Sequence, residues 1–137
     1  MITIAELASN PLDVAAHLTA VADPRAGATA LFVGTVRDHD PGADGEVVRL
    51  EYSSHPDAAQ TLANLAAEVD APDLRIAITH RIGDLAVGDV AIVCAVSSAL
   101  RAEAFDVSRA LVERVKVALP IWKRQVTADG EGSWVGL

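Results

Sequence analysis

Two lysines near the C-terminal end of the chain are the side chains best suited to acid-base chemistry. Lys116 and Lys123 are the only lysines in the 137 residues, and the other nine of the eleven basic Lys and Arg residues are arginines. Arginine stays protonated in proteins, whereas burial readily shifts the pKa of a lysine. The two lysines flank residues 120–122, a Pro-Ile-Trp segment, so one short stretch holds both candidates for proton transfer. Residue chemistry alone leaves a second interpretation equally open, in which both are ordinary surface lysines.

The charge of this stretch opposes that of the whole chain. The formal net charge is -8 and the isoelectric point is near 4.8, a balance that argues against nucleic acid as the main partner. Residues 101–124 nevertheless contain six basic and three acidic residues. This local reversal predicts a concave site for a small anion or an acidic peptide tail, although a helix with a basic face would have the same composition.

Arg37 is a further candidate for anion binding because it follows an apolar stretch. Residues 28–36 are apolar almost throughout and predict a strand in the centre of a sheet. Gly34 leaves room for a ligand to approach the backbone closely, and an arginine at a strand end can hold an anion through two parallel hydrogen bonds. The alternative is an ion pair of Arg37 with Glu51 or Asp38.

Arg101 begins the longest predicted helix, whose apolar stripe includes Phe105. The free N–H groups of a helix N-terminus attract anions, and Ser97 or Ser98 could cap this one. An arginine there is unfavourable for the helix dipole unless an anion compensates, which favours a ligand as much as a purely structural role. Arg101 and Lys116 are separated by roughly 22 Å along the helix at 1.5 Å per residue. A small ligand that contacts both therefore requires a site shared between two subunits.

The hydrophobic pattern predicts an α+β fold with three helices packed on a mostly antiparallel sheet. The first helix is expected to start at an Asn10-Pro11 cap and to end near residue 23. Residues 47–52 are expected to form a half-buried strand antiparallel to the strand at 28–36. In that strand, three side chains would share the buried face: Val48, Leu50 and Tyr52. The other expected elements are helices at 56–72 and 101–119 and strands at 75–80, 90–97, 121–127 and around Trp134, with turn-rich connections at 38–46, 81–89 and 129–132.

The composition predicts a soluble chain with one core. Hydrophobic residues make up 51% of the sequence and the mean hydropathy is +0.30, so we expect a single domain spanning residues 1–137. The longest apolar run, residues 90–96, is too short to cross a bilayer, and the N-terminus lacks the pattern of a signal peptide. Cys94 is the only cysteine, and the four histidines lack metal-ligand spacing. We therefore expect a cytoplasmic protein without a metal centre, in which His39 is the histidine closest to a candidate site.

Several short motifs, taken in order, resemble the large, catalytic subunit of molybdopterin synthase over residues 12–134. No single motif is specific, but their order and spacing together are. The motifs are Phe32-Val-Gly-Thr-Val-Arg37, Leu50-Glu-Tyr52, His80-Arg-Ile-Gly83, Val87-Gly-Asp89, Arg101-Ala-Glu-Ala-Phe105, residues 116–124, and Asp129-Gly130 with Trp134.

This resemblance implies an α/β-hammerhead fold and a homodimer at the centre of a 2:2 heterotetramer. Each end of the homodimer would bind a small ubiquitin-like sulfur-carrier subunit, whose C-terminal Gly-Gly tail enters a pocket as a thiocarboxylate. The implied activity is that of a sulfurtransferase, which moves two sulfurs in turn to cyclic pyranopterin monophosphate. The product is the dithiolene of molybdopterin, in molybdenum cofactor biosynthesis. No cofactor is expected in the site, and the composition and histidine spacing predict no metal and no contact with nucleic acid or membrane.

The resemblance also implies a role for individual residues. Arg37, Lys116 and Lys123 would line the pocket, with the two lysines as the catalytic groups. Arg101 would reach in from the other subunit, which agrees with the length of its helix. The full set implied to contact substrate is Thr35, Val36, Arg37, Leu100, Arg101, Lys116, Lys123, Arg124 and Gln125.

Two positions depart from the family pattern. Leu100 stands where a histidine is common, and Gln125 stands where a glutamate is common. These departures keep two alternatives open: a non-catalytic or slowed homologue that binds the sulfur carrier or a pterin as a scaffold, and a small-anion sensor of similar α+β build. Retained activity is favoured, because both lysines and both arginines of the implied site are present.

Overall fold

Three helices and eight strands make up the part of the chain that the computed structural model describes, which is residues 1–39, 45–128 and 132–136. The helices are α1 (Val14–Ala20), α2 (Ala58–Val69) and α3 (Arg101–Ala118). The strands are β1 (Ile2–Ala8), β2 (Ala28–Thr35), β3 (Val47–Ser54), β4 (Arg75–Arg81), β5 (Gly83–Ala86), β6 (Val90–Ser98), β7 (Ile121–Thr127) and β8 (Gly132–Gly136). The predicted α+β class with three helices is confirmed. Of the expected turn-rich connections, residues 40–44 and 129–131 lie outside the described residues. No helix in the described ranges combines the length and the apolar character needed to cross a membrane.

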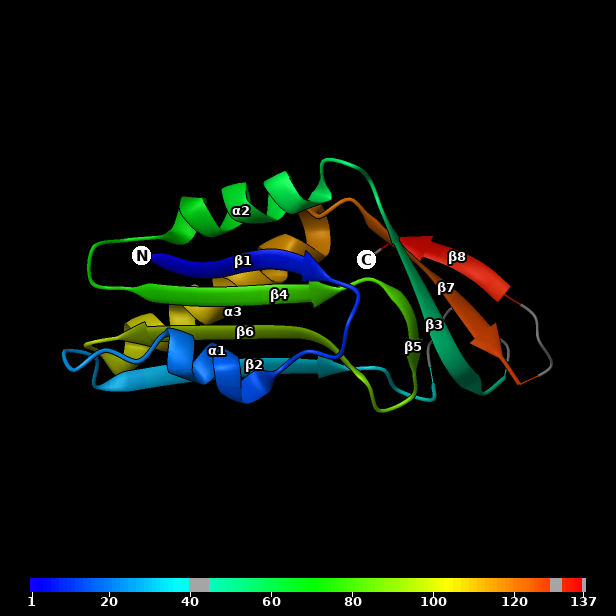
Figure 1. Cartoon of the computed structure of the whole chain (residues 1–137), viewed down its shortest axis with the longest axis horizontal. Coiled ribbons are helices and arrows are strands. Elements are labelled where there is room, and N and C mark those ends of the chain that lie inside the picture. Colours follow the sequence, from blue (N-terminus) through cyan, green and yellow to red (C-terminus); the bar gives the residue numbers. More distant parts are fainter. Residues whose placement is uncertain (40–44, 129–131, 137) are drawn as a thin grey trace.

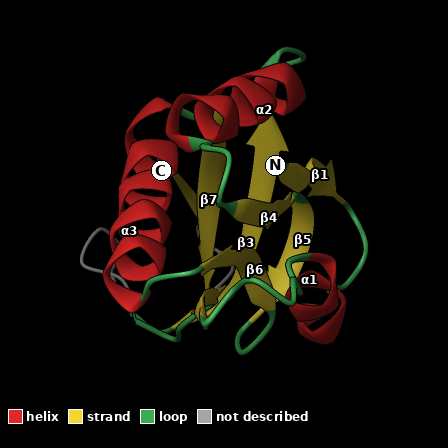
Figure 2. Cartoon of the chain, turned by 90° about the vertical axis from the view of Figure 1, so that its left-hand side faces the viewer, coloured by secondary structure: helices red, strands yellow, loops and turns green. Residues whose placement is uncertain are grey.

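The strands form two four-stranded sheets, where the sequence predicted one. The first sheet has the order β1-β4-β6-β2, and the β1–β4 pair is its parallel pair. Helices α2 and α3 cover one face of this sheet and α1 lies against the other (Figure 2). The second sheet has the order β5-β3-β7-β8 and lies at one end of the first (Figure 1). The fold is therefore a helix-covered sheet with a second sheet packed across its end.

Side chains of β4 alternate between two clusters, one on each face of the first sheet. Ile76 and Ile78 belong to the large core cluster on the side of α2 and α3. Ala77, which points the other way, packs in a small cluster with the end of α1. The imidazole of His17 on α1 reaches Thr79 Oγ1 from Nε2 at 2.7 Å and ties the helix to the sheet. The histidine in the first helix is thus structural, as expected.

The last hairpin of the second sheet, formed by β7 and β8, begins directly after Pro120, the residue that prevents α3 from continuing. The proline ring cannot continue a helix, and Leu119 already has extended backbone angles. The carbonyl of Pro120 accepts a hydrogen bond from the N–H of His55 at 3.0 Å, which starts the pairing of β7 with β3. Strand β7 therefore leads away from the C-terminal end of α3 directly into the second sheet (Figure 1).

Strand β2 lies at the edge of its sheet, and the prediction that it is central was wrong. It pairs with β6 on one side only. Three large apolar side chains along it are exposed, with relative exposures of 42%, 38% and 36% for Leu31, Phe32 and Val33. A continuous apolar strand can be buried by its own chain or by another molecule, and composition does not separate the two cases.

Strand β3 does not pair with β2 as predicted. Its neighbours are β5 and β7, both antiparallel to it. The expected buried face was wrong at one residue, since a register shift between Val47 and Arg49 leaves Val47 buried and Val48 41% exposed. When one strand contains an extra residue, the alternation of faces shifts at that point, and here Val48 points away from the buried face. Beyond this bulge Leu50 and Tyr52 are buried, as predicted.

Three local features also differ from the sequence interpretation. Helix α1 is capped by Asp13, whose side chain accepts a hydrogen bond from Ala16 N at 3.0 Å, and not by Asn10. Phe105 is 63% exposed although it was assigned to the buried stripe of α3. Strands β1 and β5 were not predicted, because β1 precedes the first strong helix signal and β5 lies within a glycine-rich connection.

Substitution of Gly34 tests how closely β2 and β6 approach beside the second sheet. A Cβ on Gly34 would lie 2.6 Å from Cγ2 of its cross-strand neighbour Ile92. We expect Gly34→Ala to lower the free energy of unfolding by about 1–3 kcal/mol, measured by urea denaturation, because one of the two strands must shift. Thr29→Ala, at an exposed position of the same strand, is the control and should stay within about 0.5 kcal/mol. Equal stability of the two variants would show that the contact is easily relieved.

Candidate functional site

A cavity of about 230 Å³ lies where the first sheet, the second sheet and the end of α3 meet. Strand β2 and the residues after it contribute one wall, and β3 and β7 of the second sheet contribute the other. The complete lining is Gly34, Thr35, Val36, Arg37, Leu50, Tyr52, Ala91, Ile92, Lys116 and Lys123. Five of the nine residues predicted to contact substrate therefore meet in one cavity: Thr35, Val36, Arg37, Lys116 and Lys123.

Lys116 reaches the cavity from the last turn of α3 and is partly buried. Burial lowers the pKa of Lys116 because the ammonium loses hydration, and the neighbouring charge of Lys123 lowers it further, while Glu113 acts in the opposite direction. A lysine with a lowered pKa is neutral in a larger fraction of molecules at a given pH. Lys116 therefore has the property that proton transfer requires.

Lys123 enters the same cavity from the second sheet. It lies on β7 directly across from Tyr52 of β3, which also lines the cavity. Because Lys116 and Lys123 come from opposite sides of the Pro120 break, a helix and a strand bring two cations to one space. A partly buried pair of positive charges favours an anionic ligand.

Backbone hydrogen bonds fix the chain at the end of β2, just before the exposed residue Arg37. Val36 donates to the carbonyl of Asp89 at 2.9 Å and accepts from Gly88 N at 2.7 Å. Gly88 has a φ of +91°, which the turn requires and which glycine adopts without strain. The turn thus holds the residue that precedes Arg37, and Arg37 itself is exposed and lines the cavity, which places it at the rim.

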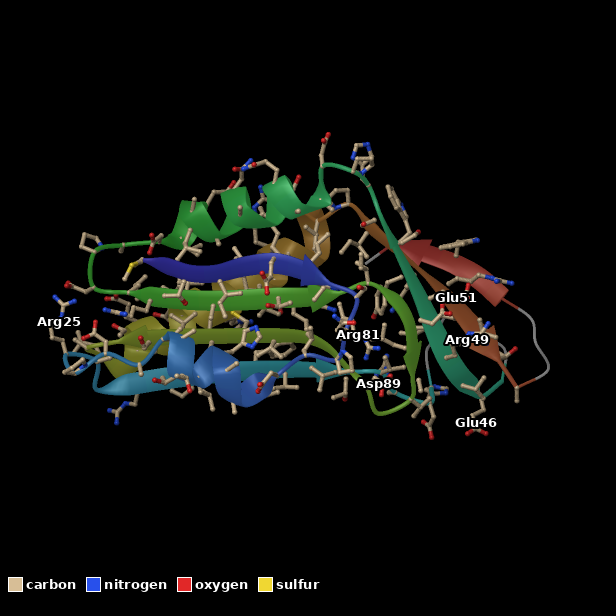
Figure 3. All side chains as sticks on the ribbon, in the orientation of Figure 1. Arg25, Glu46, Arg49, Glu51, Arg81 and Asp89 are labelled. Atoms are coloured by element: carbon tan, nitrogen blue, oxygen red, sulfur yellow. The ribbon has the colours of Figure 1, made fainter. Side chains whose placement is uncertain are left out.

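The carboxylate of Asp89 stabilises this turn. It accepts from Ala86 N at 2.9 Å and lies 3.5 Å from Nη1 of Arg81 (Figure 3). Glu51, which the sequence offered as a partner for Arg37, forms ion pairs with Arg49 at 2.8 Å and with Arg124 at 3.1 Å. Arg37 is therefore not held by Glu51, and its position at the cavity suits an external anion.

Arg124 was predicted to contact substrate, but it lies on the opposite face of the second sheet. Successive residues of a strand alternate between faces, so Lys123 and Gln125 share one face and Arg124 points the other way. Its guanidinium pairs with Glu51, which also binds Arg49, and Figure 3 shows Arg49 and Glu51 side by side on β3. These arginines, Arg49 first, lower the pKa of Glu51. Arg124 is absent from the described lining of the cavity.

Gln125 lies on the same sheet face as Lys123, across from Leu50, and is 1% exposed. Neither its Nε2 nor its Oε1 has a hydrogen-bond partner among the residues that the structure describes. Burying such an amide without partners costs free energy, and apolar side chains of similar volume would avoid that cost. Gln125 does not line the cavity itself but lies next to Leu50, which does.

Leu100 and Arg101 lie far from this cavity, at the other end of α3. Arg101 lines a separate cavity of about 310 Å³ with residues 27–30, Ala104 and Phe105, and Leu100 is 66% exposed. The predicted serine caps were wrong, because Leu100 is the N-cap residue. Ser97 Oγ donates to Val21 O at 2.6 Å, and Ser98 Oγ accepts from Leu100 N at 3.2 Å. One chain alone does not bring Arg101 and Lys116 together.

Sequence reasoning missed the apolar and aromatic part of the lining. Leu50 and Tyr52 were predicted to be buried, and Ile92 lies in the predicted strand at 90–97. All three belong to the core, but each also borders the cavity. The alternation along β3 identified the buried face of Leu50 and Tyr52 without revealing that a space lies above it. His39, the histidine expected nearest the site, is exposed and is not among the described lining residues. Cys94 lies in the predicted strand at 90–97 and is buried in the core, and burial raises the pKa of its thiol to about 12.

Comparison with known proteins gives the family of the chain. A family model described as "MoaE protein" matches residues 7–118. A curated relative from Mycobacterium tuberculosis, named molybdopterin synthase catalytic subunit 1, is 41% identical over 133 residues, which cover 95% of this chain and 88% of that protein. The chain belongs to the MoaE family of molybdopterin synthase catalytic subunits. The resemblance inferred from the short motifs is thereby confirmed.

Other MoaE relatives agree over the same length. The molybdopterin synthase catalytic subunit of Bacillus subtilis is 40% identical, with 96% of this chain and 83% of that protein covered. Among solved structures, molybdopterin synthase from Staphylococcus aureus matches with a TM-score of 0.88 at 30% identity, over 96% of both chains. The MoaE protein from Burkholderia ambifaria matches with a TM-score of 0.81 at 32% identity, over 98% of this chain and 89% of that one. These matches support the hammerhead architecture that the resemblance implied.

The charges around Lys116 make its titration testable in this MoaE chain. Lys123→Gln is expected to raise the pKa of Lys116, because it removes a neighbouring positive charge, and Glu113→Gln is expected to lower it, because it removes a stabilising negative charge. NMR titration of chains labelled at lysine measures both effects, and in Lys123→Gln the label reports Lys116 alone. Glu6→Gln, on the distant strand β1, serves as the control. Shifts of equal sign in the two test variants would contradict the assigned electrostatics.

Proposed function

We propose that this chain is the catalytic subunit of a molybdopterin synthase. It would transfer sulfur from the C-terminal thiocarboxylate of a small ubiquitin-like carrier to cyclic pyranopterin monophosphate, making the dithiolene of molybdopterin. The observation that carries the proposal is the cavity in which Lys116 and Lys123 meet, with Arg37 at its rim. The names of the relatives support it, since they are molybdopterin synthase catalytic subunits and "catalytic subunit" implies a second component in those proteins.

The cavity suits the charges of both reactants. A thiocarboxylate and a phosphate are anions, and the cavity combines two lysines with an arginine at an open edge. Arginine matches phosphate through paired donors, whereas lysine acts as a compact charge that can also release a proton. Arg37 is therefore assigned to the phosphate of the pterin, and the lysines to the carrier tail and the reacting atoms.

Each sulfur transfer exchanges one sulfur for one oxygen without net oxidation or reduction. A carbon–sulfur bond forms on the pterin side chain as a carbon–oxygen bond at the same carbon breaks. On the carrier the acyl–sulfur bond breaks as an acyl–oxygen bond forms, so the carrier leaves as a carboxylate. Proton transfers accompany these steps, and a lysine with a lowered pKa can supply and accept protons. Lys116 is assigned the place nearest the thiocarboxylate, because its pKa is lowered by burial. Lys123 is assigned to bind the pterin and to assist proton transfer.

A second copy of the chain would complete the site by pairing along β2. The edge strand offers unpaired backbone groups together with exposed Leu31, Phe32 and Val33, and Phe105 of α3 is exposed beside them. Edge strands with such side chains are normally covered. A dimer with a two-fold axis near the middle of β2 would cover both edges at once.

Such antiparallel pairing also explains the distance between Arg101 and Lys116. Arg101 lies beside the Ala28 end of β2, and the lysine cavity lies at its Thr35 end. Across a two-fold axis, the Ala28 end of one strand lies opposite the Thr35 end of the other. Arg101 of one chain would then approach the cavity of the second chain, which is the arrangement that the length of α3 requires.

A slowed or purely scaffolding homologue is the second candidate. It is favoured by Leu100, an exposed apolar residue where the family commonly has histidine, and by the unpartnered amide of Gln125. In this case the chain would bind the carrier and the pterin precursor without forming product. The cytoplasmic location and the single-domain organisation expected from the sequence likewise stay predictions.

Replacement of each lysine tests the catalytic assignment. With thiocarboxylated carrier and pterin precursor, Lys116→Ala and Lys123→Ala should each lower the rate of molybdopterin formation by roughly 100-fold or more, the usual range for loss of an acid-base group. Carrier binding, measured by size-exclusion chromatography, should persist. Arg124→Ala is the matched control, because its side chain lies on the other sheet face. Full activity of both lysine variants would show that the lysines are not the catalytic groups. A wild-type chain that binds the carrier but forms no product would instead favour the scaffolding homologue.

Mixed dimers test the shared site. Arg101→Ala and Lys116→Ala chains should each be inactive alone, but a mixed dimer would contain one intact site, made from Lys116 of the first chain and Arg101 of the second. Random mixing at equal amounts should restore about a quarter of the wild-type activity per chain, because half of the dimers are mixed and each has one working site of two. Absence of any recovery, with mixed dimers verified by tagging, would place both residues in one subunit's site.

A further inference from the structure

His80 is a fully buried imidazole directly beneath the lysine cavity, and nothing so far assigns it a role. It is 0% exposed and lies next to the end of β4. Its cross-strand neighbour on β6 is Ile92, which lines the cavity. Its ring also meets the ring of Tyr52, another lining residue, edge to face at a centroid distance of 5.2 Å and an angle of 77°. His80 thus joins the two sheets at the floor of the cavity.

One nitrogen of this ring is satisfied and the other is not. Nδ1 lies 2.7 Å from the carbonyl oxygen of Arg81. Because a carbonyl only accepts, Nδ1 carries the proton of the neutral ring and Nε2 has a free lone pair. Nε2 is buried and has no hydrogen-bond partner in the described parts of the chain. Burial lowers the pKa of His80 to about 4, so the ring is neutral at physiological pH and Nε2 acts as an acceptor.

Lys116 is a strong donor that lines the same cavity as Ile92 and Tyr52, the two residues that neighbour His80. Its positive charge also helps to keep the His80 ring neutral. The other charged groups that bear on Lys116 are Lys123, from the second sheet, and Glu113, from its own helix. The neutral imidazole of His80 lies below the cavity and can accept a hydrogen bond. The ammonium of Lys116 has three N–H donors, one of which could be given to it.

We propose that His80 is a positioning residue whose Nε2 accepts a hydrogen bond from the ammonium of Lys116 when that side chain turns toward the floor of the cavity. The bond fixes the direction of Lys116 and stabilises its proton against the loss of hydration. Arg81, whose carbonyl holds Nδ1, fixes the ring in the tautomer that makes this possible. The role of this bond in sulfur transfer rests on the proposed function, whereas its effect on the titration of Lys116 does not.

Two substitutions of His80 separate the acceptor from the ring. His80→Asn keeps a polar group near the position of Nδ1 but does not reach that of Nε2, and His80→Gln places an amide at the position of Nε2. We expect the midpoint of the Lys116 titration, measured by NMR with lysine labelling, to fall by about one pH unit in His80→Asn, since the ammonium loses an acceptor. His80→Gln should keep the midpoint close to wild type. The chain has two lysines, so the Lys123 signal provides an internal reference.

Wild-type behaviour of His80→Asn would overturn the proposal, and so would an equal fall in both variants, because the effect would then follow loss of the ring and not of the acceptor. A measurement on the intact ring applies if His80→Asn loses its wild-type circular dichroism. The nitrogen-15 shift of Nε2 in the wild-type chain should follow the titration of Lys116 and change in Lys116→Met. A shift that responds to neither contradicts the bond. These readouts need no catalysis, so they stand even if product formation fails.

The catalytic consequence is measured separately. If the proposed function holds, His80→Asn should lower kcat for molybdopterin formation about 10-fold or more, with KM for the pterin precursor nearly unchanged, because positioning acts on the reacting lysine and not on phosphate binding. His80→Gln should recover most of kcat. A rise in KM at constant kcat would instead place His80 in substrate binding and overturn its role as a positioning residue.

Discussion

The removal of Lys116 from water is the physical constraint on which the site depends. A lone ammonium avoids partial burial, and here a second cation, Lys123, adds repulsion from across the cavity. The fold opposes this cost with rigid elements: α3 carries Lys116 on its last turn, Pro120 ends the helix, and β7 turns back with Lys123. Because α3 and β7 are built into the core, the backbone cannot move the two charges apart, and only rotation of the lysine side chains can reduce the repulsion. An anion in the cavity would relieve it, so the free protein is prepared for a negatively charged ligand.

Three residues in the described parts of the chain have buried side-chain polar atoms without a partner, namely His80, Arg81 and Gln125, and two of them lie next to residues that line the same cavity. His80 lies under the cavity and Gln125 lies beside its wall, and both have buried polar atoms that lack a partner within the described residues. Buried polar groups are normally satisfied, so two such groups near one cavity represent stability given up locally. The large aliphatic cluster formed by α2, α3 and β4 is the part of the fold that compensates, because its side chains are closely buried and apolar.

Much of the fold could be predicted from periodicity, and the failures have physical causes. The helices at α2 and α3 and the strands β4, β6 and β7 show clear patterns, since each buries one defined set of side chains. The position of β2 could not be read, because an apolar strand has the same composition whether its own chain or another molecule covers it. The bulge at Val48 depends on how β3 pairs with β7, which is a tertiary property. The lysines were identifiable from their rarity. The orientation of Arg124 was within reach, since strand alternation separates it from Lys123, but a cluster of basic residues in sequence suggested a cluster in space.

The hydrogen bonds of Val36 have a consequence for selectivity. This residue follows β2 and exchanges hydrogen bonds with Gly88 and Asp89, which continues the pairing of β2 with β6. The same turn carries the chain from β5 of the second sheet into β6 of the first, so this seam ties the backbones of the two walls together on one side of the cavity. A larger guest cannot be admitted by spreading the sheets at this seam. Adjustment is left to the long side chains of Arg37, Lys116 and Lys123, which can change the charge distribution and reach of the cavity but hardly its width. We expect such a cavity to select a guest by its thickness at the seam and by its negative charge, and a flat, anionic guest meets both conditions.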